Sequence, residues 1–420
     1  MDRLSDLSLL PDDLIFKILS FVPSKVTVTT SLLSKRWRSL WKHVPALVYA
    51  DPYIDSEYWR ASRFIDKFLL LRDTHASLET VNLYVGQNCP PTDIETWVGV
   101  AVSRGVRHLL FCQCSPRPYF LPIRLPRSLY TCETLVTLRL QQAFIVDVPL
   151  NICFPSLKSL SLIFVDFSSD ETVHQLLSSC LVLEDLKVVR GNYDVKTFKI
   201  MVPSLQRLTV NAVFTNGDPV TVPDAGFMIE TPCLKSLAII SQFGWIHSLV
   251  KMPYLVKANI KLRHGDSKNL LGCVTSAKHL SLCVKKPMGS YPVGDFSQLV
   301  SLKVCTCSLE WYRLILRRAP KLRFLRFQGQ ANLLPSSYID DLKKCYRTSG
   351  DVETQWERPS SVPECLISSL QIIEWNDYKG TVAEKSEAKY LFENSRQLKT
   401  MSSTTSVESL HEGVLSNDGL

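Results

Sequence analysis

A short apolar pattern recurs through the middle of this 420-residue chain and constrains its fold more than any other feature. It consists of one apolar residue, a second three positions later and a third two positions after that, as in Leu135, Leu138 and Leu140. Eleven copies follow one another at steps of 21 to 29 residues, from Leu78 to Phe327. Such a period indicates an array of stacked units rather than one closed core.

The spacing predicts a β-strand in each unit, because residues two apart on a strand point to the same face. Stacked units bury that face continuously and form a curved parallel sheet. The pattern resembles the leucine-rich repeat, although the usual ninth-position Asn or Cys occurs only as Cys114 and Cys307. The alternative, a doubly wound α/β sheet, requires helical segments of about 10–15 residues between all strands. Such segments are not present throughout, so a degenerate solenoid is predicted.

Some segments between the strands carry helix signals. Thr92 and Glu95, like Ser168 and Glu171, have the spacing of a capping box ahead of an apolar stripe, and Trp311 begins a third stripe. We expect helices at these three places and irregular returns elsewhere.

Residues 4–45 lie outside the repeat and predict short helices. A helix is expected to open at Pro11, because proline fits a first helical turn and two acidic residues follow it. Its next turns carry one apolar stripe, formed by Leu14, Ile15, Ile18, Leu19 and Val22. A unit of fewer than about 50 residues buries little surface alone. These apolar groups are therefore expected to pack on the repeats or to meet a partner.

The same segment resembles the F-box in order and spacing. The matching residues are Leu10-Pro11, Asp13-Leu14, Ile18-Leu19, Val22-Pro23 and the run from Leu33 to Trp41. The resemblance implies a helical module that binds a Skp-family adaptor and, through it, a cullin–RING ubiquitin ligase. The adaptor-binding residues that it implies are Leu10, Pro11, Leu14, Ile18, Leu19, Leu33, Trp37, Leu40 and Trp41.

This segment has two other interpretations. One is a helical cap on the repeat array, which such folds need at their ends. The other is a nucleic-acid patch around Lys35, Arg36 and Arg38. Three basic residues without a groove-reading element support that interpretation only weakly, so no nucleic-acid partner is expected.

A different pattern follows residue 345. It contains Pro363-Glu364-Cys365-Leu366, then Glu374-Trp375 and Tyr378-Lys379-Gly380-Thr381, and it ends at Met401. The spacing of apolar residues predicts a helix over residues 384–400. The order of these motifs resembles the FBD module of plant F-box proteins, which implies an α+β cap of one strand and one helix. The module's last apolar strand is expected to be missing. Residues 403–420, rich in Ser and Thr, are expected to form a disordered tail.

The cysteines indicate in which cellular compartment the chain is found. The 13 cysteines are an odd number without a C-x-x-C pair, and most lie beside apolar residues, as Cys153 does between Ile152 and Phe154. They predict reduced core thiols in the cytoplasm or nucleus, and no zinc site. The N-terminus lacks a signal-peptide layout, and no apolar run approaches the roughly 18 residues of a membrane span. We therefore expect no membrane partner.

Catalytic signatures are missing from the sequence. It contains no phosphate-binding glycine loop, no nucleophile elbow and no H-E-x-x-H zinc motif, and its eight histidines are scattered. We expect a protein without enzymatic activity, cofactor or metal.

Strand residues that face away from the core carry a basic excess. At the third and fifth positions of the units, which point to the concave surface, six residues are basic and only Asp185 is acidic. The basic residues are Arg139, Lys187, Arg207, Lys257, Lys303 and Arg326. The whole chain is far more balanced, with 48 basic and 40 acidic residues. The concave surface is expected to bind an acidic or phosphorylated target, the alternative being an ordinary solvated strand face.

Together these features predict an α/β chain with an N-terminal helical F-box (1–48), a degenerate leucine-rich-repeat solenoid (49–345) and an α+β FBD cap (350–402). The predicted function is the substrate-recognition subunit of a Skp–cullin–F-box ubiquitin ligase, in which the F-box binds the adaptor and the repeats bind the target protein. Two alternatives stay open. One is an interaction scaffold whose partner is not degraded, and the other is a repeat-containing regulator of an enzyme, with the N-terminal helices serving only as a cap.

Overall fold

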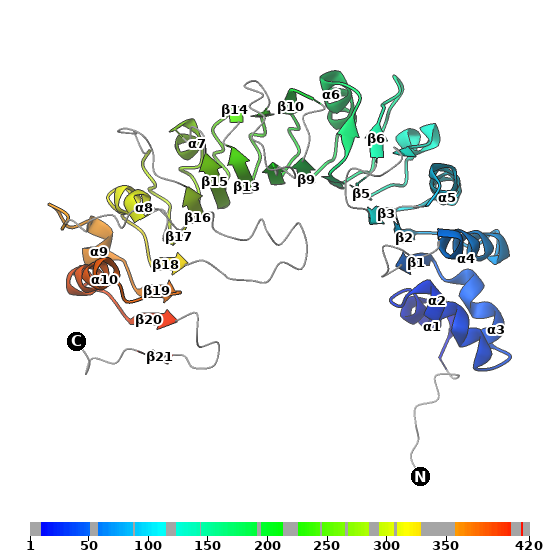
Figure 1. Ribbon diagram of the computed structural model, residues 1–420, viewed down its shortest axis with the longest axis horizontal. Helices are drawn as coiled ribbons and strands as arrows, with labels where there is room; N and C mark the ends of the chain where they lie inside the picture. The colour runs from blue at the N-terminus through cyan, green and yellow to red at the C-terminus, as the bar shows by residue number, and fades with distance from the viewer. Residues whose placement is uncertain are drawn as a thin grey trace, which may run out of the picture. The chain divides into compact units, whose positions relative to one another are not determined.

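The computed structural model describes residues 10–50, 58–86, 89–114, 123–142, 144–190, 195–212, 226–243, 246–264, 268–284, 294–305, 309–328, 358–404 and 413–414. The chain is a mixed α/β protein with a large parallel sheet (Figure 1). It divides into two compact units: unit 1 comprises residues 1–205 with 222–225, and unit 2 comprises residues 206–221 with 226–420.

Unit 1 begins with helices and continues with strands that alternate with helical or irregular returns. Its helices are α1 (Asp12–Leu19), α2 (Ser24–Thr29), α3 (Trp37–Leu40), α4 (Tyr58–Leu71), α5 (Pro91–Ser103) and α6 (Asp170–Ser178), with 3-10 turns η2 (Thr30–Leu32), η3 (Trp41–His43) and η4 (Arg127–Thr131). Its strands are β1 (Ala46–Ala50), β2 (Thr80–Gly86), β3 (His108–Cys114), β4 (Ile123–Arg124), β5 (Thr137–Gln141), β6 (Phe144–Val146), β7 (Ser159–Ile163), β8 (Asp166–Phe167), β9 (Asp185–Arg190) and β10 (Thr197–Ile200).

Six strands of unit 1 pair in parallel, in the order β1-β2-β3-β5-β7-β9. The register aligns the repeat leucines, so that Leu138, Leu160 and Leu186 form one buried row across β5, β7 and β9. Figure 1 shows α4, α5 and α6 on one side of these strands. We call the opposite strand face, which carries residues such as Thr137 and Arg139, the open face. The strand predicted for each unit is confirmed.

The start of the sheet was not anticipated from the sequence. Strand β1 pairs with β2, and α4 follows it, in a segment that lacks the repeat pattern. Helix α2 contacts β1, and the backbone N–H of Val48 donates to Ser24 Oγ at 2.8 Å. The N-terminal helices therefore cover the first edge of the sheet, which would otherwise offer unpaired backbone groups.

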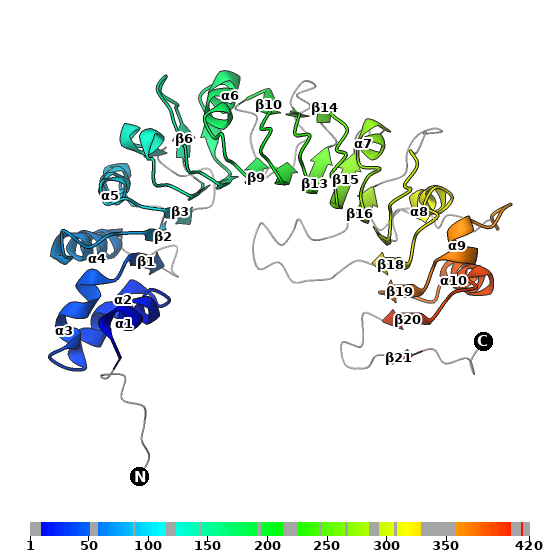
Figure 2. The ribbon, with the colours of Figure 1, turned by 180° about the vertical axis from the view of Figure 1, so that it is seen from behind.

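Unit 2 continues the same architecture. Its strands are β11 (Arg207–Ala212), β12 (Gly226–Ile229), β13 (Ser236–Phe243), β14 (Ile246–Leu249), β15 (Lys257–His264), β16 (His279–Val284), β17 (Ser301–Cys305), β18 (Phe324–Gln328), β19 (Ile372–Asn376), β20 (Thr400–Thr404) and β21 (Gly413–Val414). Its helices are α7 (Lys268–Cys273), α8 (Leu309–Leu316), α9 (Glu364–Ser368) and α10 (Val382–Asn394). Strands β11, β13, β15 to β18, β19 and β20 pair in parallel, and Figure 2 shows α7, α8, α9 and α10 on one side of them.

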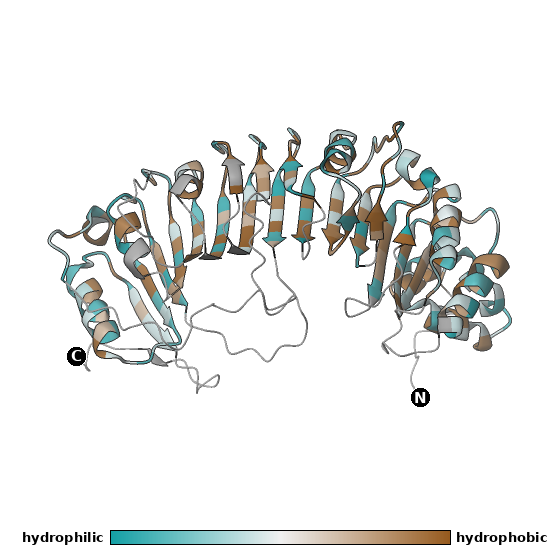
Figure 3. Ribbon diagram, turned by 45° about the horizontal axis from the view of Figure 1, so that its top comes forward, coloured by the Kyte–Doolittle hydropathy of each residue, from teal (hydrophilic) through white to brown (hydrophobic). Residues whose placement is uncertain are grey.

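Hydropathy alternates along the paired strands, as Figure 3 shows by its brown and teal bands. In β16, for example, Leu280 and Leu282 are buried while His279 is exposed and Ser281 is half-buried. The apolar residues face the helices and the polar ones form the open face of unit 2.

The C-terminal segment extends the repeat array, which corrects the expected cap of one strand and one helix. Strands β19 and β20 continue the parallel register, in which Leu325 aligns with Ile373 and Ile373 aligns with Met401. Two helices accompany them. Helix α10 ends at Asn394 rather than running to residue 400, because a turn and strand β20 occupy the remaining residues.

The last parallel strand is polar rather than missing. Strand β20 reaches Thr404 with Met401 as its one large apolar side chain, and Ser402 and Ser403 pair antiparallel with Val414 and Gly413. The prediction of a disordered tail is therefore wrong for residues 403–404 and 413–414. Backbone pairing satisfies these residues even though their side chains give no alternating apolar pattern. Residues 405–412 and 415–420 lie outside the described residues.

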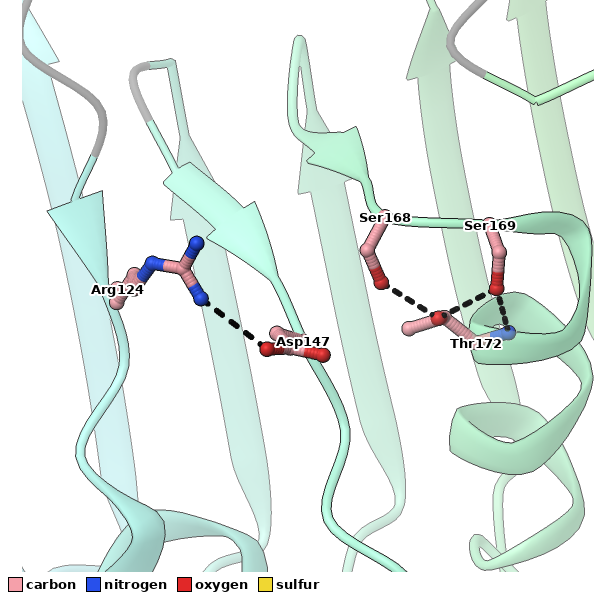
Figure 4. Close-up of polar contacts among 5 residues, drawn as sticks. All are labelled: Arg124, Asp147, Ser168, Ser169 and Thr172. Atoms are coloured by element: carbon pink, nitrogen blue, oxygen red, sulfur yellow. Dashed lines mark hydrogen bonds and ion pairs between the residues drawn. The ribbon is translucent and has the colours of Figure 1, made fainter.

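The predicted helices occur, with caps that differ from the expected ones. Helix α5 opens with Pro91 and contains Thr92, and α6 is capped by Ser169 rather than Ser168. Figure 4 shows the Ser169 hydroxyl accepting from the backbone N–H of Thr172, while Ser168 Oγ lies 2.8 Å from Thr172 Oγ1. The sequence pattern thus located this helix correctly and its cap one residue too early.

Among the residues that the structure describes, three other than glycine have a left-handed backbone, and they share one place in the repeat. Gln142, Phe164 and Asp377, with φ of 62°, 53° and 60°, each follow the first leucine of their unit by seven residues. There the chain turns out of the parallel strand, and the backbone N–H of Gln142 donates to Ile163 O at 2.8 Å. This corner is the eighth position of the repeat. It directly precedes the ninth position, at which most units lack the usual Asn.

Most cysteines with described side chains are buried, including Cys112, Cys180 and Cys365. Cys153, which the sequence indicated as a core residue, is exposed, so that prediction is wrong for this position. Within the described residues, no helix is long and apolar enough to cross a membrane.

Candidate interaction surfaces

Helix α1 has two apolar stripes, not the single stripe expected from the sequence. Ile15 and Leu19 are 0% and 4% exposed and face the core. Leu14 and Ile18 are both 48% exposed, and Phe21, just beyond the helix, is 79% exposed. Both stripes follow a spacing of three to four residues, so spacing alone could not separate the inward side from the outward side.

The inward stripe builds a small core. It joins Trp37, Leu40, Val44 and Ala46, and the Trp41 ring lies 5.5 Å from that of Phe68 in α4. Four residues expected to contact an adaptor are therefore buried, namely Leu19, Trp37, Leu40 and Trp41. Their side chains stabilise the packing of the helices, so any direct contact with a partner is left to exposed residues.

The outward side carries large apolar groups in contact with water. Of the expected adaptor residues, Leu14, Ile18, Leu33 and Pro11 are exposed, and Leu10 is half-buried. Three further large apolar residues of this segment are exposed too, namely Phe21, Val26 and Leu32 at 79%, 49% and 86%. We define the apolar helical surface as Leu14, Ile18, Phe21, Val26, Leu32 and Leu33. Phe21 was detectable, because it lies seven residues after Leu14 and so continues its stripe.

Arg36 fixes the orientation of α1. Its Nη2 donates to the backbone O of Leu10 and to Asp12 Oδ1, both at 2.5 Å. Asp12 also lies in the first turn, where the helix dipole favours a negative charge. Of the two basic residues next to Trp37, Arg36 therefore has a structural role, which weakens the nucleic-acid interpretation of that segment.

A buried arginine connects the N-terminal helices to the first repeats. Arg72, 2% exposed, donates to the backbone oxygens of Val44 and Ser77. Burial, with a smaller effect of Arg104, lowers the pKa of Arg72 to about 10, so the guanidinium is still charged at neutral pH. The backbone N–H of Asp73 also donates to Lys42 O. These bonds make the helices and the early strands one folded body within unit 1.

On the open face of unit 1, the structure brings two of the expected basic residues together. Arg139 on β5 aligns with Ser161 on β7, which aligns with Lys187 on β9. All three line a hollow of 330 Å³. Burial, together with the charge of Arg139, lowers the pKa of the Lys187 ammonium.

The open face of unit 2 carries the other four basic residues. Arg207 on β11 and Lys257 on β15 both align with Ser236 on the strand between them. Lys303 and Arg326 align directly with each other on β17 and β18. Burial and the charges of Arg326 and Lys261 lower the pKa of Lys303. Lys261 was missed by counting only the third and fifth positions, although it lies on the same strand face.

One of these basic residues is already neutralised. Arg326 Nε donates to Glu374 Oε2, which lies next to it on β19. The sequence count of one acidic residue on this face omitted β19, so Glu374 is a second one. Within the described residues, no group of three metal-ligating side chains is present.

Comparison with known families agrees with this architecture. The F-box profile matches residues 7–48, the profile for the leucine-rich repeats of an FBD-associated F-box protein matches 94–279, and the FBD profile matches 357–402. A protein of Arabidopsis thaliana named as an FBD-associated F-box protein is 58% identical over 406 residues, covering 96% of this chain and 92% of the relative. The chain belongs to the FBD-associated F-box protein family.

Other members of this family in Arabidopsis thaliana are more distant. One named as an F-box/FBD/LRR-repeat protein is 37% identical over 408 residues, covering 95% of this chain and 90% of the relative. Within this F-box protein, the F-box match spans α1 to β1 and the FBD match spans α9 to β20. The FBD is thus the part of the array in which β19 and β20 continue the repeat.

Proposed function

We propose that this F-box protein is the substrate-recognition subunit of a Skp–cullin–F-box ubiquitin ligase, acting in the cytoplasm or nucleus. The observation that carries the proposal is the apolar helical surface of the F-box. A module this small does not leave six large apolar side chains in water without use, since patches of this kind mark protein-binding sites.

The set of proposed adaptor contacts differs from the set of residues that the F-box motif implies. Leu14, Ile18 and Leu33 are retained as direct contacts, and Phe21 and Leu32 are added because they are more exposed. Leu19, Trp37, Leu40 and Trp41 are assigned to the core that orients them. Anchors in the centre of an interface contribute most of its free energy.

The open face is the proposed site for the target protein. Its basic residues favour an acidic or phosphorylated segment through charge-assisted hydrogen bonds. Lys187 and Lys303 are the residues in which burial and like charges already disfavour the ammonium form. A bound anion would relieve that repulsion.

In this function the chain performs no chemistry. It holds a target close to the ligase that modifies it, and the gain comes from effective concentration rather than from catalysis. The hydrogen bonds of Arg72 suit this role, because they hold the F-box helices against the first repeats of unit 1.

The adaptor part is tested by co-purification of the full chain with a Skp-family adaptor. Leu14→Ala combined with Ile18→Ala should weaken binding by at least about tenfold, since two exposed anchors are truncated. Leu150→Ala is the matched control, because Leu150 is 96% exposed but lies outside the F-box. Full retention of the adaptor by the double variant would show that the surface is not the contact.

The target part is tested in cells. Charge reversal of Arg207, Lys257 and Lys303 together should abolish capture of the physiological target, and removing the chain should lengthen the target's half-life. Capture without a change in half-life would favour the non-degradative scaffold. A chain that co-purifies with no adaptor at all would instead favour a regulator whose N-terminal helices only cap the repeats.

A further inference from the structure

The hollow on the open face of unit 1 has a floor made from three adjacent strands. Arg139, Ser161 and Lys187 occupy one row of the register across β5, β7 and β9. Neighbouring strands lie about 4.8 Å apart, so the outer two residues start from backbones roughly 10 Å apart. Their side chains can therefore reach a small group placed above Ser161.

Two polar atoms of this floor are buried without a hydrogen-bond partner, namely Arg139 Nε and Ser161 Oγ. Such atoms are rare in folded proteins, because each one loses the free energy of its bond to water. Arg139 has one weak contact of its own, from Nη2 to Gln141 Oε1 at 3.3 Å. The floor thus presents donors that nothing in the described chain satisfies.

The charge of the hollow favours an anion. Arg139 and Lys187 form no ion pair with any described residue. Arg139 lies close enough to Lys187 to lower, together with burial, the pKa of its ammonium. One carboxylate, Asp185, lies on the adjacent row with Ser159 and Thr137, and His108 Nδ1 is 3.2 Å from Thr137 Oγ1. Arg139, Lys187 and Asp185 give the hollow a net formal charge of +1.

We propose that this hollow binds a phosphate monoester, with Arg139, Ser161 and Lys187 as its donors. The proposal rests on the proposed function in so far as the ester is a phosphorylated side chain of the target, while a free small ester would use the same chemistry. Three donors arriving from three strands fit a tetrahedral group with three oxygens better than a flat carboxylate with two. A volume of 330 Å³ is within the range of small-ligand pockets.

The basic cluster of unit 2 does not offer the same site. Arg326 is paired with Glu374 there, so its charge is already compensated. The control position is Lys389 on α10, which lies off the open face and has a side chain that is 71% exposed.

The test is calorimetric titration of the full chain with inorganic phosphate, glycerol phosphate, a phosphoserine peptide and the same peptide with glutamate. Wild type should bind the three phosphate probes and bind the glutamate peptide at least about tenfold more weakly. Lys187→Gln and Arg139→Gln should each weaken phosphate binding about tenfold, the equivalent of one charged hydrogen bond. Ser161→Ala should weaken it less, while Lys389→Gln should leave it unchanged.

Several results would overturn the site. They are no binding of phosphate probes at tens of millimolar, equal affinity for the glutamate peptide, or wild-type affinity in Lys187→Gln with an unchanged circular dichroism spectrum. Tighter binding of the phosphoserine peptide than of glycerol phosphate would assign the ester to a target, and equal binding would assign it to a free ligand. The titration needs no adaptor, so a failed adaptor experiment leaves this result standing, and a failed titration leaves the adaptor assignment standing.

Discussion

The guanidinium of Arg313 donates a hydrogen bond from Nη2 to Glu387 Oε2, and this ion pair joins α8 of the last leucine-rich repeat to α10 of the FBD. The Glu387 side chain is 3% exposed. Nearby, the Phe327 and Trp375 rings stack at 4.2 Å. The FBD is therefore built into unit 2 rather than attached to it.

Removing the arginine should destabilise this end of the chain strongly. Arg313→Gln leaves a buried carboxylate without its cation, which costs about 3–5 kcal/mol in comparable pairs. The loss is measured as faster hydrogen exchange of the α10 amides at pH 8. Arg358→Gln is the control, because Arg358 is largely exposed and lies 3.9 Å from Glu393. Unchanged exchange in Arg313→Gln would mean that the ion pair contributes nothing.

The same pair should make stability depend on pH. Burial raises the pKa of Glu387 to about 7, while the guanidinium acts in the opposite direction. Because the folded state then holds a proton that the unfolded state has released, the free energy of unfolding falls as pH rises from about 4.5 to 7 and levels off above. Glu387→Gln should remove this slope from α10 exchange. A slope that persists in Glu387→Gln would assign it to other groups.

The two stripes of α1 should separate stability from binding. Ile15→Ala empties a fully buried site and should lower the free energy of unfolding by about 2–5 kcal/mol. Leu14→Ala, one residue away, should change it by less than about 0.5 kcal/mol and weaken the adaptor complex. Thermal melting and adaptor titration of both variants measure the two effects. Equal melting temperatures for the two variants would contradict the division of the helix.

The left-handed corner of the repeat predicts an unusual tolerance of glycine. At Gln142, with φ of 62°, an L side chain costs about 1–2 kcal/mol that glycine avoids. Gln142→Gly should therefore match or exceed wild type in melting temperature, apart from the loss of the side chain's own contacts. Gln142→Val should melt lower, because a branched side chain tolerates this conformation least. The opposite order of the two variants would argue against strain at this corner.

The sequence was most informative where periodicity had a single structural solution. Eleven repeated apolar triplets predicted eleven strands, because stacked units can bury such a face in only one way. Periodicity failed at α1, where two stripes three to four residues apart look alike and only the packing of Trp37 and Leu40 decides which is inside. The basic residues of the open face were placed correctly, but pairing such as Arg326 with Glu374 joins residues 48 positions apart.

Elements without a pattern of their own were missed. Strand β1 has no repeat leucine ahead of it. It pairs with the edge of β2, whose backbone groups need hydrogen-bonding partners. Strand β20 is mostly Ser and Thr, so composition indicated disorder, whereas its backbone pairs with β19 over five residues. In both cases the neighbouring strand determines the structure, and no local sequence signal reports it.

The polar last strand has a consequence for how these chains behave in concentrated solution. An array of parallel strands can grow by adding another chain to its free edge, and such head-to-tail growth has no natural end. In this chain the first edge lies under α2, and the final strand offers Thr400, Ser402 and Ser403 with β21 paired across two of its residues. An edge of this composition favours water over another strand. Strand β20 thus has the polar composition expected of an edge that disfavours pairing with another chain.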